Sequence, residues 1–394
     1  MNKDPRTIVI GTVGCGYGAF LHANGYRHNM SGIPIRLKTV CDMNVEKAEE
    51  FRARYGYEQV CTDFDQLCAD PEIELIDLAL PPVFHIAFAI KALNAGKNVI
   101  CEKPVSGYFG DRKTENIGKT VKKSEMWKEM QSGLEELRAA VNSSGKKFFY
   151  AENFIYATPV QKAAEILRAK KTKIVMMTGE ETIVGSSSPM AGQWKNFGGG
   201  TIMRNGIHPL TGMLYLKQVE AKARGEEITV KSVTADCGQQ TLCLKEDERQ
   251  YINARPEDVE DVAVITVTFS DGTKCITICS DGILGGSRNY INIFGHDAAM
   301  VCNLNPTDLL NTYVSDEKGL DNVAWGELIT SKLGWNKVFV SDEVIRGYTG
   351  EMTSFLEAVA YDKEPESGFD LAYDVIRIIY AAYQSAEEGR RIDL

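Results

Sequence analysis

The sequence has no long apolar run, no paired spacing of cysteines and no excess of positive charge. Without a stretch of ~18 apolar residues, no transmembrane helix is expected, and the start of the chain lacks the apolar region of a signal peptide. The formal net charge of −10 argues against nucleic acid and anionic membranes as partners. With 394 residues, 44% hydrophobic and 25% charged, the chain has the composition of a soluble globular protein, and we expect it in the cytoplasm.

Ten cysteines and five histidines are scattered along the chain without a metal or disulfide spacing. No Cys-x-x-Cys motif occurs, and the histidines do not complete a zinc pattern. Several cysteines lie in apolar, strand-like stretches, where a free thiol behaves as a small hydrophobic group. We therefore expect reduced thiols and no metal site.

The first apolar stretch, residues 7–13, leads into a glycine pattern that is typical of dinucleotide binding. In this G-x-G-x-x-A pattern, Gly14 permits a tight turn and Gly16 lets the backbone approach a pyrophosphate. Ala19 is small enough for close packing of the following helix, whose N-terminus would face the phosphates. Tyr17 lies within the same loop, and we predict all four residues as part of a cofactor site.

Asp42 follows the second predicted strand, residues 36–41. A carboxylate at this place would accept hydrogen bonds from the adenosine ribose and repel a 2′-phosphate, which favours NAD over NADP. The alternative is that Asp42 caps the next helix, a role that Asn44 can fill instead. The sequence therefore predicts Asp42 as the ribose-binding residue.

The alternation of strands and helices continues through about the first 105 residues. Residues 75–80 and 98–101 read as two more strands, each preceded by a helical stretch. This order predicts an α/β fold with a doubly wound parallel sheet of Rossmann type. We assign residues 1–150 to this NAD-binding domain.

Glu102, Lys103 and Pro104 follow the strand at residues 98–101. Ligands of open α/β sheets lie beyond the carboxyl ends of the strands. A positively charged nicotinamide ring there would favour the neutral amine of Lys103, which could take a proton from a substrate hydroxyl as hydride leaves the same carbon. The alternative is a surface lysine before a turn-forming proline.

An ordered set of short motifs extends along nearly the whole chain. They are Gly14-Cys15-Gly16 with His22, Asp42, Pro81 with His85, Ala95-Gly96-Lys97, Glu102-Lys103-Pro104, Gly198-Gly199-Gly200, Gly206-Ile207-His208 and residues 381–389. This set resembles the Gfo/Idh/MocA family of oxidoreductases, which includes glucose–fructose oxidoreductase and inositol dehydrogenase. The resemblance implies that Lys103 is the catalytic lysine. It also places Pro81, His85 and Glu102 with Lys103 in the cofactor site.

Two positions depart from the family pattern. Arg204 stands where the family usually has an aspartate four residues before the catalytic histidine. Pro82 stands where an asparagine often follows Pro81. The first departure leaves the usual Lys–Asp–His proton relay incomplete, so catalysis would rest on Lys103 and His208, or the substrate pocket is built differently.

His208 precedes a proline that suits the start of a helix running to residue 225. A histidine at a helix N-terminus tends to stay neutral and can exchange a proton with a hydroxyl under oxidation. The alternative is a capping residue without chemistry. Arg204 and Asn205 are candidate substrate-binding residues, although a salt bridge is the stronger interpretation of Arg204.

Three further residues are candidates for binding a carbohydrate. Asn153 and Tyr156 follow the predicted strand at residues 147–154 and could bind a polyol, whereas Asn153 could instead cap a helix. Trp194 lies in a loop rich in glycine and serine and could stack on a sugar, or it could plug the space under that loop. The polar segment 106–123 could be a solvated loop, a lid or an oligomer arm.

The second part of the chain, residues 151–394, is predicted as an α+β domain for substrate binding and oligomerisation. Period-two stretches that read as strands occur at residues 228–233, 262–269, 274–279, 290–294 and 299–302. They predict a large, mostly antiparallel sheet with helices on one face, and helices at 352–360 and 372–388 follow. The family resemblance implies that the other face makes a homo-oligomer, either a dimer or a tetramer.

These patterns predict an NAD-dependent oxidoreductase that acts on a hydroxyl of a sugar, polyol or glycoside. Oxidation of a glycoside at its 3-position with retained NAD is one form of this prediction. The alternatives are an NAD-dependent glycoside hydrolase that acts by redox-assisted elimination and a catalytically silent NAD-binding sensor.

Overall fold

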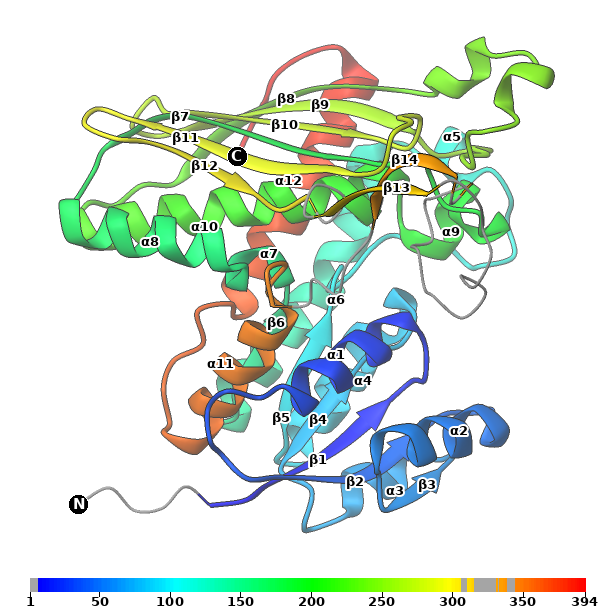
Figure 1. The fold of residues 1–394 in the computed structure, drawn as a ribbon, viewed down its shortest axis with the longest axis vertical. Helices are drawn as coiled ribbons and strands as arrows, with labels where there is room; N and C mark the ends of the chain where they lie inside the picture. The colour runs from blue at the N-terminus through cyan, green and yellow to red at the C-terminus, as the bar shows by residue number, and fades with distance from the viewer. Residues whose placement is uncertain (1–5, 306–309, 315–330, 332, 339–343) are drawn as a thin grey trace.

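The computed structural model describes residues 6–305, 310–314, 331, 333–338 and 344–394. They form two large sheets with helices between and around them (Figure 1). The sheet in the lower half of Figure 1 belongs to the first part of the chain, and the upper sheet belongs to the later part.

The first sheet has six strands in the order β3-β2-β1-β4-β5-β6, and all neighbouring strands are parallel. Its strands are β1 (Ile8–Val13), β2 (Ile35–Cys41), β3 (Gln59–Cys61), β4 (Leu75–Leu78), β5 (Asn98–Glu102) and β6 (Phe148–Ala151). The central strands β1, β4 and β5 are largely buried because helices cover both faces. The predicted doubly wound parallel sheet is confirmed.

Of the helices of this domain, α2 (Val45–Tyr55) shows most clearly how the sequence determines both ends. The helices are α1 (Tyr17–Arg27), α2 (Val45–Tyr55), α3 (Phe64–Ala69), the 3-10 turn η1 (Pro82–Phe84), α4 (His85–Asn94), α5 (Ile117–Thr120) and α6 (Lys123–Ser144). In α2, the Asn44 side chain accepts a 3.0 Å hydrogen bond from the Lys47 N–H, and Gly56 ends the helix with a φ of 80°. Ala48 and Phe51 form its buried face.

The second sheet has seven strands in the order β12-β11-β7-β10-β9-β8-β15. They are β7 (Ile174–Thr182), β8 (Val230–Gly238), β9 (Val262–Phe269), β10 (Lys274–Ser280), β11 (Arg288–Gly295), β12 (Ala299–Asn303) and β15 (Ile392–Asp393). Only the pair β7 and β10 is parallel among the neighbours in this described sheet. In β9, Ala263, Ile265 and Val267 are buried and alternate with more exposed residues. The predicted large, mostly antiparallel sheet is confirmed.

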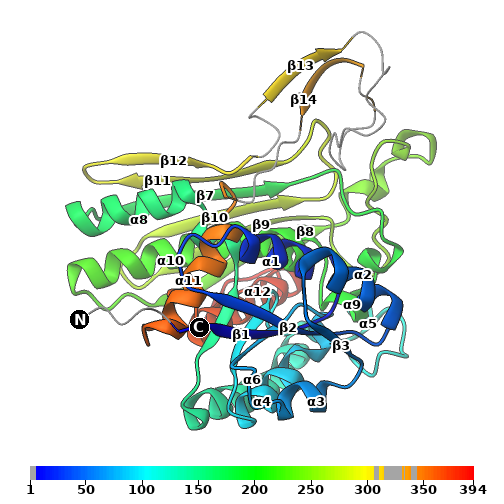
Figure 2. The ribbon, with the colours of Figure 1, turned by 60° about the horizontal axis from the view of Figure 1, so that its bottom comes forward.

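Helices cover the side of the second sheet that faces the first domain (Figure 1). The helices and turns of this part are α7 (Asn153–Tyr156), α8 (Thr158–Lys170), η2 (Pro189–Gly192), α9 (Trp194–Phe197), η3 (Ile202–Gly206), α10 (Ile207–Arg224), η4 (Gln240–Cys243), η5 (Asp247–Arg249), α11 (Tyr348–Ala360) and α12 (Phe369–Glu388). α8, α10 and α12 lie beneath the sheet in Figure 1. A separate antiparallel pair, β13 (Leu310–Val314) and β14 (Gly334–Val338), projects beyond β12 in Figure 2.

The last two helices connect the two parts of the molecule. α11 packs against α1, and α12 packs against both α6 and β8. The contact of α11 with α1 is close because Gly25 has no side chain, since a Cβ there would lie 2.7 Å from Cγ of Met352. The last two helices therefore contact both domains.

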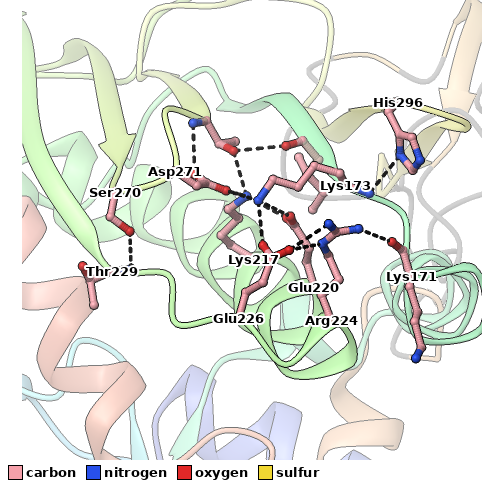
Figure 3. A network of polar contacts seen from close by, with 12 residues as sticks. Lys171, Lys173, Lys217, Glu220, Arg224, Glu226, Thr229, Ser270, Asp271 and His296 are labelled. Carbon is pink, nitrogen blue, oxygen red and sulfur yellow. Dashed lines mark hydrogen bonds and ion pairs between the residues drawn. The ribbon is translucent and has the colours of Figure 1, made fainter.

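Figure 3 shows a network of charged side chains at the C-terminal end of α10. The Nζ atom of Lys217, which is buried, donates to Glu220 at 2.7 Å, to Asp271 at 2.8 Å and to Thr273 at 2.7 Å. Lys173 adds an ion pair to Asp271 at 2.7 Å. The network ties the turn between β9 and β10 to α10.

Two elements differ from the sequence-based expectation near the space between the sheets. The strand expected at residues 147–154 ends at Ala151, because the side chain of Glu152 accepts from the Phe154 N–H at 3.3 Å and caps α7. The helix expected to begin near Pro209 is already helical from Thr201 and has π-helical geometry over η3. Within the described part of the chain, no helix combines the length and apolar character needed to cross a membrane.

Candidate active site

A cleft of about 810 Å³ lies between the two sheets. The first domain contributes the turns that follow β1, β2, β4 and β5 to its wall. The second domain contributes the end of β7, the loop before α9, the π-helical turn η3 and the start of β11. The cleft therefore lies where ligands of open α/β sheets bind, beyond the carboxyl ends of the strands.

The glycine loop after β1 leaves room for a ligand backbone. Gly14 has a φ of 96°, and a Cβ there would lie 2.3 Å from the Ala79 carbonyl oxygen, so only glycine fits. A Cβ on Gly16 would meet no described atom within 4 Å, so the space beside it is open to the cleft. Tyr17 also lines the cleft, whereas Ala19 is fully buried and packs against β2 and α2. This arrangement fits a dinucleotide phosphate on the N-terminus of α1.

The carboxylate of Asp42 lies at the far end of this loop. Its two oxygens accept from the Cys15 N–H at 3.0 Å and from the Asn44 N–H at 2.9 Å. The capping role in α2 belongs to Asn44, so the alternative interpretation of Asp42 as the cap is wrong. Asp42 lines the cleft, and each of its oxygens can accept a further hydrogen bond. Lys47, which was not predicted, also lines the cleft.

Glu102 is held by a chain of buried polar groups. Its carboxylate lies 3.2 Å from Nε2 of His22, and Nδ1 of His22 lies 2.9 Å from Asp77. Burial alone would lower the pKa of His22, but Asp77 and Glu102 outweigh it and raise the pKa well above its usual value. Glu102 in turn accepts the Lys103 N–H at 2.8 Å. The carboxylate of Glu102 thereby connects the backbone that carries Lys103 to His22 and Asp77.

The amine of Lys103 crosses the cleft to the second domain. Its Nζ atom donates to the backbone oxygen of Arg204 at 2.7 Å. In η3 the N–H of Ile207 donates to the oxygen of Ile202, five residues earlier. In the same register, the Arg204 oxygen would need the N–H of residue 209, which is Pro209 and has none. The π-helical turn thus leaves a carbonyl for Lys103.

His208 faces a carboxylate that the sequence analysis did not select. Its Nδ1 lies 2.6 Å from Oε1 of Glu152, which is fully buried, and its ring stacks on Phe154 with centroids 5.1 Å apart. A carboxylate on one ring nitrogen fixes the tautomer and leaves the other nitrogen for chemistry. Glu152 follows a buried strand directly, which is the signal that could have identified it. Because the helix extends back to Thr201, His208 is not at a helix N-terminus, and the dipole argument for its neutrality was wrong.

Arg204, which replaces the usual family aspartate, forms an ion pair with Asp281. Asp281 also accepts from the amide of Asn205 at 2.7 Å. Burial raises the pKa of Asp281 despite the opposing charge of Arg204. The salt-bridge interpretation of Arg204 is confirmed, and both Arg204 and Asn205 line the cleft.

Besides Ala19, three predicted site residues do not line the cleft. Trp194 is 2% exposed and packs against Tyr383 with ring centroids 4.7 Å apart, so it plugs the space under the loop and has no face for a sugar. Tyr156 is buried against Phe355. The ring nitrogens of His85 lie 2.8 Å from the carbonyl oxygens of Pro104 and Leu80, so His85 braces the turns and does not face a cofactor.

The polar segment 106–123 does not cover the cleft. Its Tyr108 N–H donates to the hydroxyl of Tyr380 at 2.6 Å, and its Gly118 N–H donates to Asp258 at 2.9 Å. Gly107 packs directly on Gly198, the first residue of the triple glycine. None of the cleft-lining residues comes from this segment, so the lid interpretation is wrong.

The remaining predicted residues of the cleft are Asn153 and Pro81, and Pro82, which stands where the family often has an asparagine, also lines it. The Asn153 amide donates to the backbone oxygen of Arg346 at 2.9 Å. Glu181 at the end of β7 and Asn289 at the start of β11 also line the cleft and were not identified from the sequence. Among the described residues, no group of three or more histidine, cysteine, aspartate or glutamate side chains could hold a metal ion.

Comparison with known proteins identifies the family. Residues 8–125 match its NAD-binding Rossmann domain, and residues 172–394 match its C-terminal α/β domain. The chain belongs to the Gfo/Idh/MocA oxidoreductase family. The family resemblance inferred from the motifs is confirmed, and the first domain is its NAD-binding domain.

Relatives of known name are distant in sequence. The chain is 22% identical to D-glucoside 3-dehydrogenase of Escherichia coli over 402 aligned positions, covering 100% of this chain and 99% of that enzyme. It is 33% identical to levoglucosan dehydrogenase of Pseudarthrobacter phenanthrenivorans over 107 residues, which span only 26% of this chain and 27% of that enzyme.

Solved structures show the same fold over the whole chain. The structure of GenD2 from gentamicin A biosynthesis with NAD has a TM-score of 0.76 at 20% identity and covers 100% of this chain and 98% of that one. Levoglucosan dehydrogenase with NADH and levoglucosan has a TM-score of 0.69 at 20% identity and covers 98% and 99%.

Proposed function

We propose that the protein is an NAD-dependent dehydrogenase that oxidises a ring or chain hydroxyl of a neutral carbohydrate or glycoside. The observation that carries this proposal is the convergence of Lys103 and His208 on one cleft with the NAD loop. The cofactor, when bound, accepts the hydride that leaves the carbinol carbon. The residues of the chain must then hold the sugar and take the hydroxyl proton.

Lys103 is the acid–base residue in this proposal. Its amine has one described protein partner, the Arg204 oxygen at 2.7 Å, so it keeps lone-pair and donor capacity toward a substrate hydroxyl. His208 holds the same hydroxyl through the ring nitrogen that does not face Glu152. Arg204 does not take the place of the family aspartate, because it is paired with Asp281.

The proposed substrate class rests on the polar lining of the cleft and on the full-length relative that is named a D-glucoside 3-dehydrogenase. Asn153, Asn205, Asn253, Ser186 and Ser187 line the second-domain side with amides and hydroxyls, which recognise sugar hydroxyls. Oxidation of a glycoside at the 3-position is the most specific form of the proposal.

Absorbance of reduced nicotinamide tests the proposed reaction. Purified protein would be assayed for bound NAD after denaturation and then given a panel of sugars, polyols and glycosides with added NAD. Repeated turnover with one compound class supports a dehydrogenase with exchangeable NAD. A single stoichiometric burst supports retained NAD. Release of free sugar without net reduction would contradict the proposal and favour a hydrolase, and bound NAD without any reaction would favour a sensor.

The oligomeric state and location remain predictions. We propose a homo-oligomer, a dimer or tetramer, that forms through the side of the second sheet not covered by α8, α10 and α12. Val264 and Phe294 are each 44% exposed there. Light scattering at several concentrations would check this, and a monomer at all of them would contradict it. A cytoplasmic location and the domain boundary at residue 150 are likewise proposed.

A further inference from the structure

Two buried oxygen atoms on the second sheet face the cleft without a partner. Glu181 is 6% exposed and Asn289 is 2% exposed, and both line the cleft. Neither Oε2 of Glu181 nor Oδ1 of Asn289 has a hydrogen-bond partner among the residues that the structure describes. Buried polar atoms normally have a hydrogen-bond partner, so two buried oxygens without one need an explanation.

The two residues form a cross-strand pair. Glu181 of β7 lies directly opposite Asn289 of β11 in the antiparallel register. Residues opposite one another project from the same face of a sheet, with Cβ atoms roughly 5 Å apart. The two side chains therefore project next to each other from the second-domain wall of the cleft.

The neighbouring residue Glu180 shows that burial alone does not leave a carboxylate unpaired here. Glu180 is 7% exposed, yet it accepts from Tyr290 at 2.6 Å and from Thr182 at 2.9 Å, and it pairs with Arg288 at 2.9 Å. Because side chains alternate along a strand, Glu180 faces away from the cleft and Glu181 faces into it. The unsatisfied carboxylate is the one that faces the cleft.

We propose that Glu181 and Asn289 form a subsite that accepts hydrogen bonds from two hydroxyls on adjacent carbons of a neutral carbohydrate. This proposal rests on the proposed function and specifies its substrate as a vicinal diol. Two acceptors need two hydrogen donors, which carboxylates and phosphates of an anionic ligand do not supply. Lys103 of the first domain and Arg346 act electrostatically on Glu181, so this carboxylate already has positive charge nearby, which favours a neutral ligand over a cation.

The direct test compares steady-state constants of four single variants with the wild-type enzyme. With the best neutral substrate of the wild type, Glu181→Gln and Asn289→Ala should each raise KM about 10- to 100-fold, as for loss of a hydrogen bond to a buried group. The value of kcat should stay within about threefold, and the KM for NAD should not change. The controls Glu180→Gln and Asn292→Ala, on the same strands but facing away, should leave KM unchanged. Wild-type KM values in Glu181→Gln and Asn289→Ala would overturn the subsite.

Deoxy analogues locate the two hydroxyls. The wild type should bind more weakly to analogues that lack either of two adjacent hydroxyls. The Asn289→Ala variant should bind one of these two analogues as well as it binds the parent compound, because the hydroxyl that Asn289 contacts is the one missing from that analogue. If the loss of affinity caused by the Asn289→Ala substitution adds fully to the loss caused by removing a hydroxyl, for every analogue, the proposal is overturned. Tighter binding of an amino analogue than of its hydroxyl parent would also overturn it, because that result would assign the site to a cation.

A binding measurement separates this proposal from the proposed function. If the wild type oxidises no carbohydrate, the dehydrogenase proposal fails. Calorimetric titration of the same neutral compounds into wild-type protein saturated with NADH then tests binding at the subsite independently of turnover. Binding that is weakened about 10-fold or more in Asn289→Ala would support it, and the absence of binding to the wild type would overturn it.

Discussion

The two ends of helix α10 carry buried charges that are treated in opposite ways. Near its C-terminus, Lys217 donates to two carboxylates and a hydroxyl, all within 2.8 Å (Figure 3). The other oxygen of Glu220 accepts no hydrogen bond from a described residue, but it forms an ion pair with Lys173 at 3.4 Å. Near its start, Glu152 and Glu181 each keep a buried oxygen without a partner among the described residues. Both regions combine a lysine with buried carboxylates, Lys217 at one end and Lys103 of the first domain at the other, so residue type alone does not distinguish them.

Buried polar atoms that lack a protein partner indicate where a ligand binds. Leaving a buried polar group unpaired costs about 1–3 kcal/mol, and a fold tolerates this where a bound molecule restores the hydrogen bond. At the paired end, burial would raise the pKa of Asp271, but Lys173 and Lys217 lower it below its usual range. At the cleft end, burial raises the pKa of Glu181, and nearby His208, Arg346 and Lys103 only partly offset it. We infer that the first cluster stabilises the fold and the second binds substrate.

The largest effect is expected from breaking the paired cluster. Replacement of Lys217 by methionine would leave Glu220 and Asp271 without their buried cation, and the free energy of unfolding should fall by about 3–5 kcal/mol. Urea denaturation would measure the loss, with Lys222→Met on the exposed side of α10 as the matched control. A variant as stable as the wild type would show that the network contributes no stability.

The next largest effect is expected from Glu152→Gln. The amide can present its NH₂ to Nδ1 of His208 and hold the wrong tautomer, so kcat should fall about 100-fold while NAD binding is kept. Because Oε1 of Glu152 contacts His208 and also accepts from the Phe154 N–H, an amide that turns its NH₂ toward His208 gives up the cap of α7, and the free energy of unfolding should fall by about 1 kcal/mol. Equal kcat for the variant and the wild type would contradict the role of Glu152 in fixing the tautomer of His208.

A smaller effect is expected at the adenosine end of the cleft. Asp42→Ala should weaken NAD binding about 10-fold and reduce the preference for NAD over NADP, because the ribose hydroxyls lose a charged acceptor. Fluorescence titration with both cofactors would measure it, and Glu50→Ala on the exposed face of α2 serves as the control. Unchanged NAD affinity would contradict the assignment of Asp42.

The smallest effect is a gain of stability in Glu181→Gln. Since the folded-state pKa of Glu181 is raised, its contribution to stability is full below the unfolded pKa and is lost as the pH rises through the folded pKa. The variant should therefore be more stable than the wild type by about 1 kcal/mol at pH 8, and the gain should vanish near pH 4. Glu180→Gln should show no such gain. Thermal denaturation at both pH values decides the matter, and a loss of stability at pH 8 would contradict it.

Sequence reasoning reached the fold because local pattern determines it. Continuous apolar runs, helix-ending glycines and the period-two residues of β9 can be recognised within a single segment, without knowing which other segment packs against it. The position of Gly14, Asp42 and Lys103 at the cleft was predictable for the same reason, since each residue lies at a fixed place after a strand.

The missed features depend on contacts between distant segments. The pairing of Glu181 with Asn289 requires the register of two strands that are 108 residues apart. The burial of Trp194 requires α12 to pack on its loop, and the carbonyl free for Lys103 requires a π-helical turn before Pro209. No local pattern carries that information.

The most direct test of the central claim is rapid mixing of a reactive carbohydrate with NAD-loaded wild type and Lys103→Ala. We expect both proteins to bind NAD equally. We expect the rate of nicotinamide reduction in Lys103→Ala to be lower by about 10²- to 10⁴-fold, which is the contribution of a general base. Reduction at the wild-type rate in Lys103→Ala would contradict the role of Lys103 as the residue that takes the hydroxyl proton.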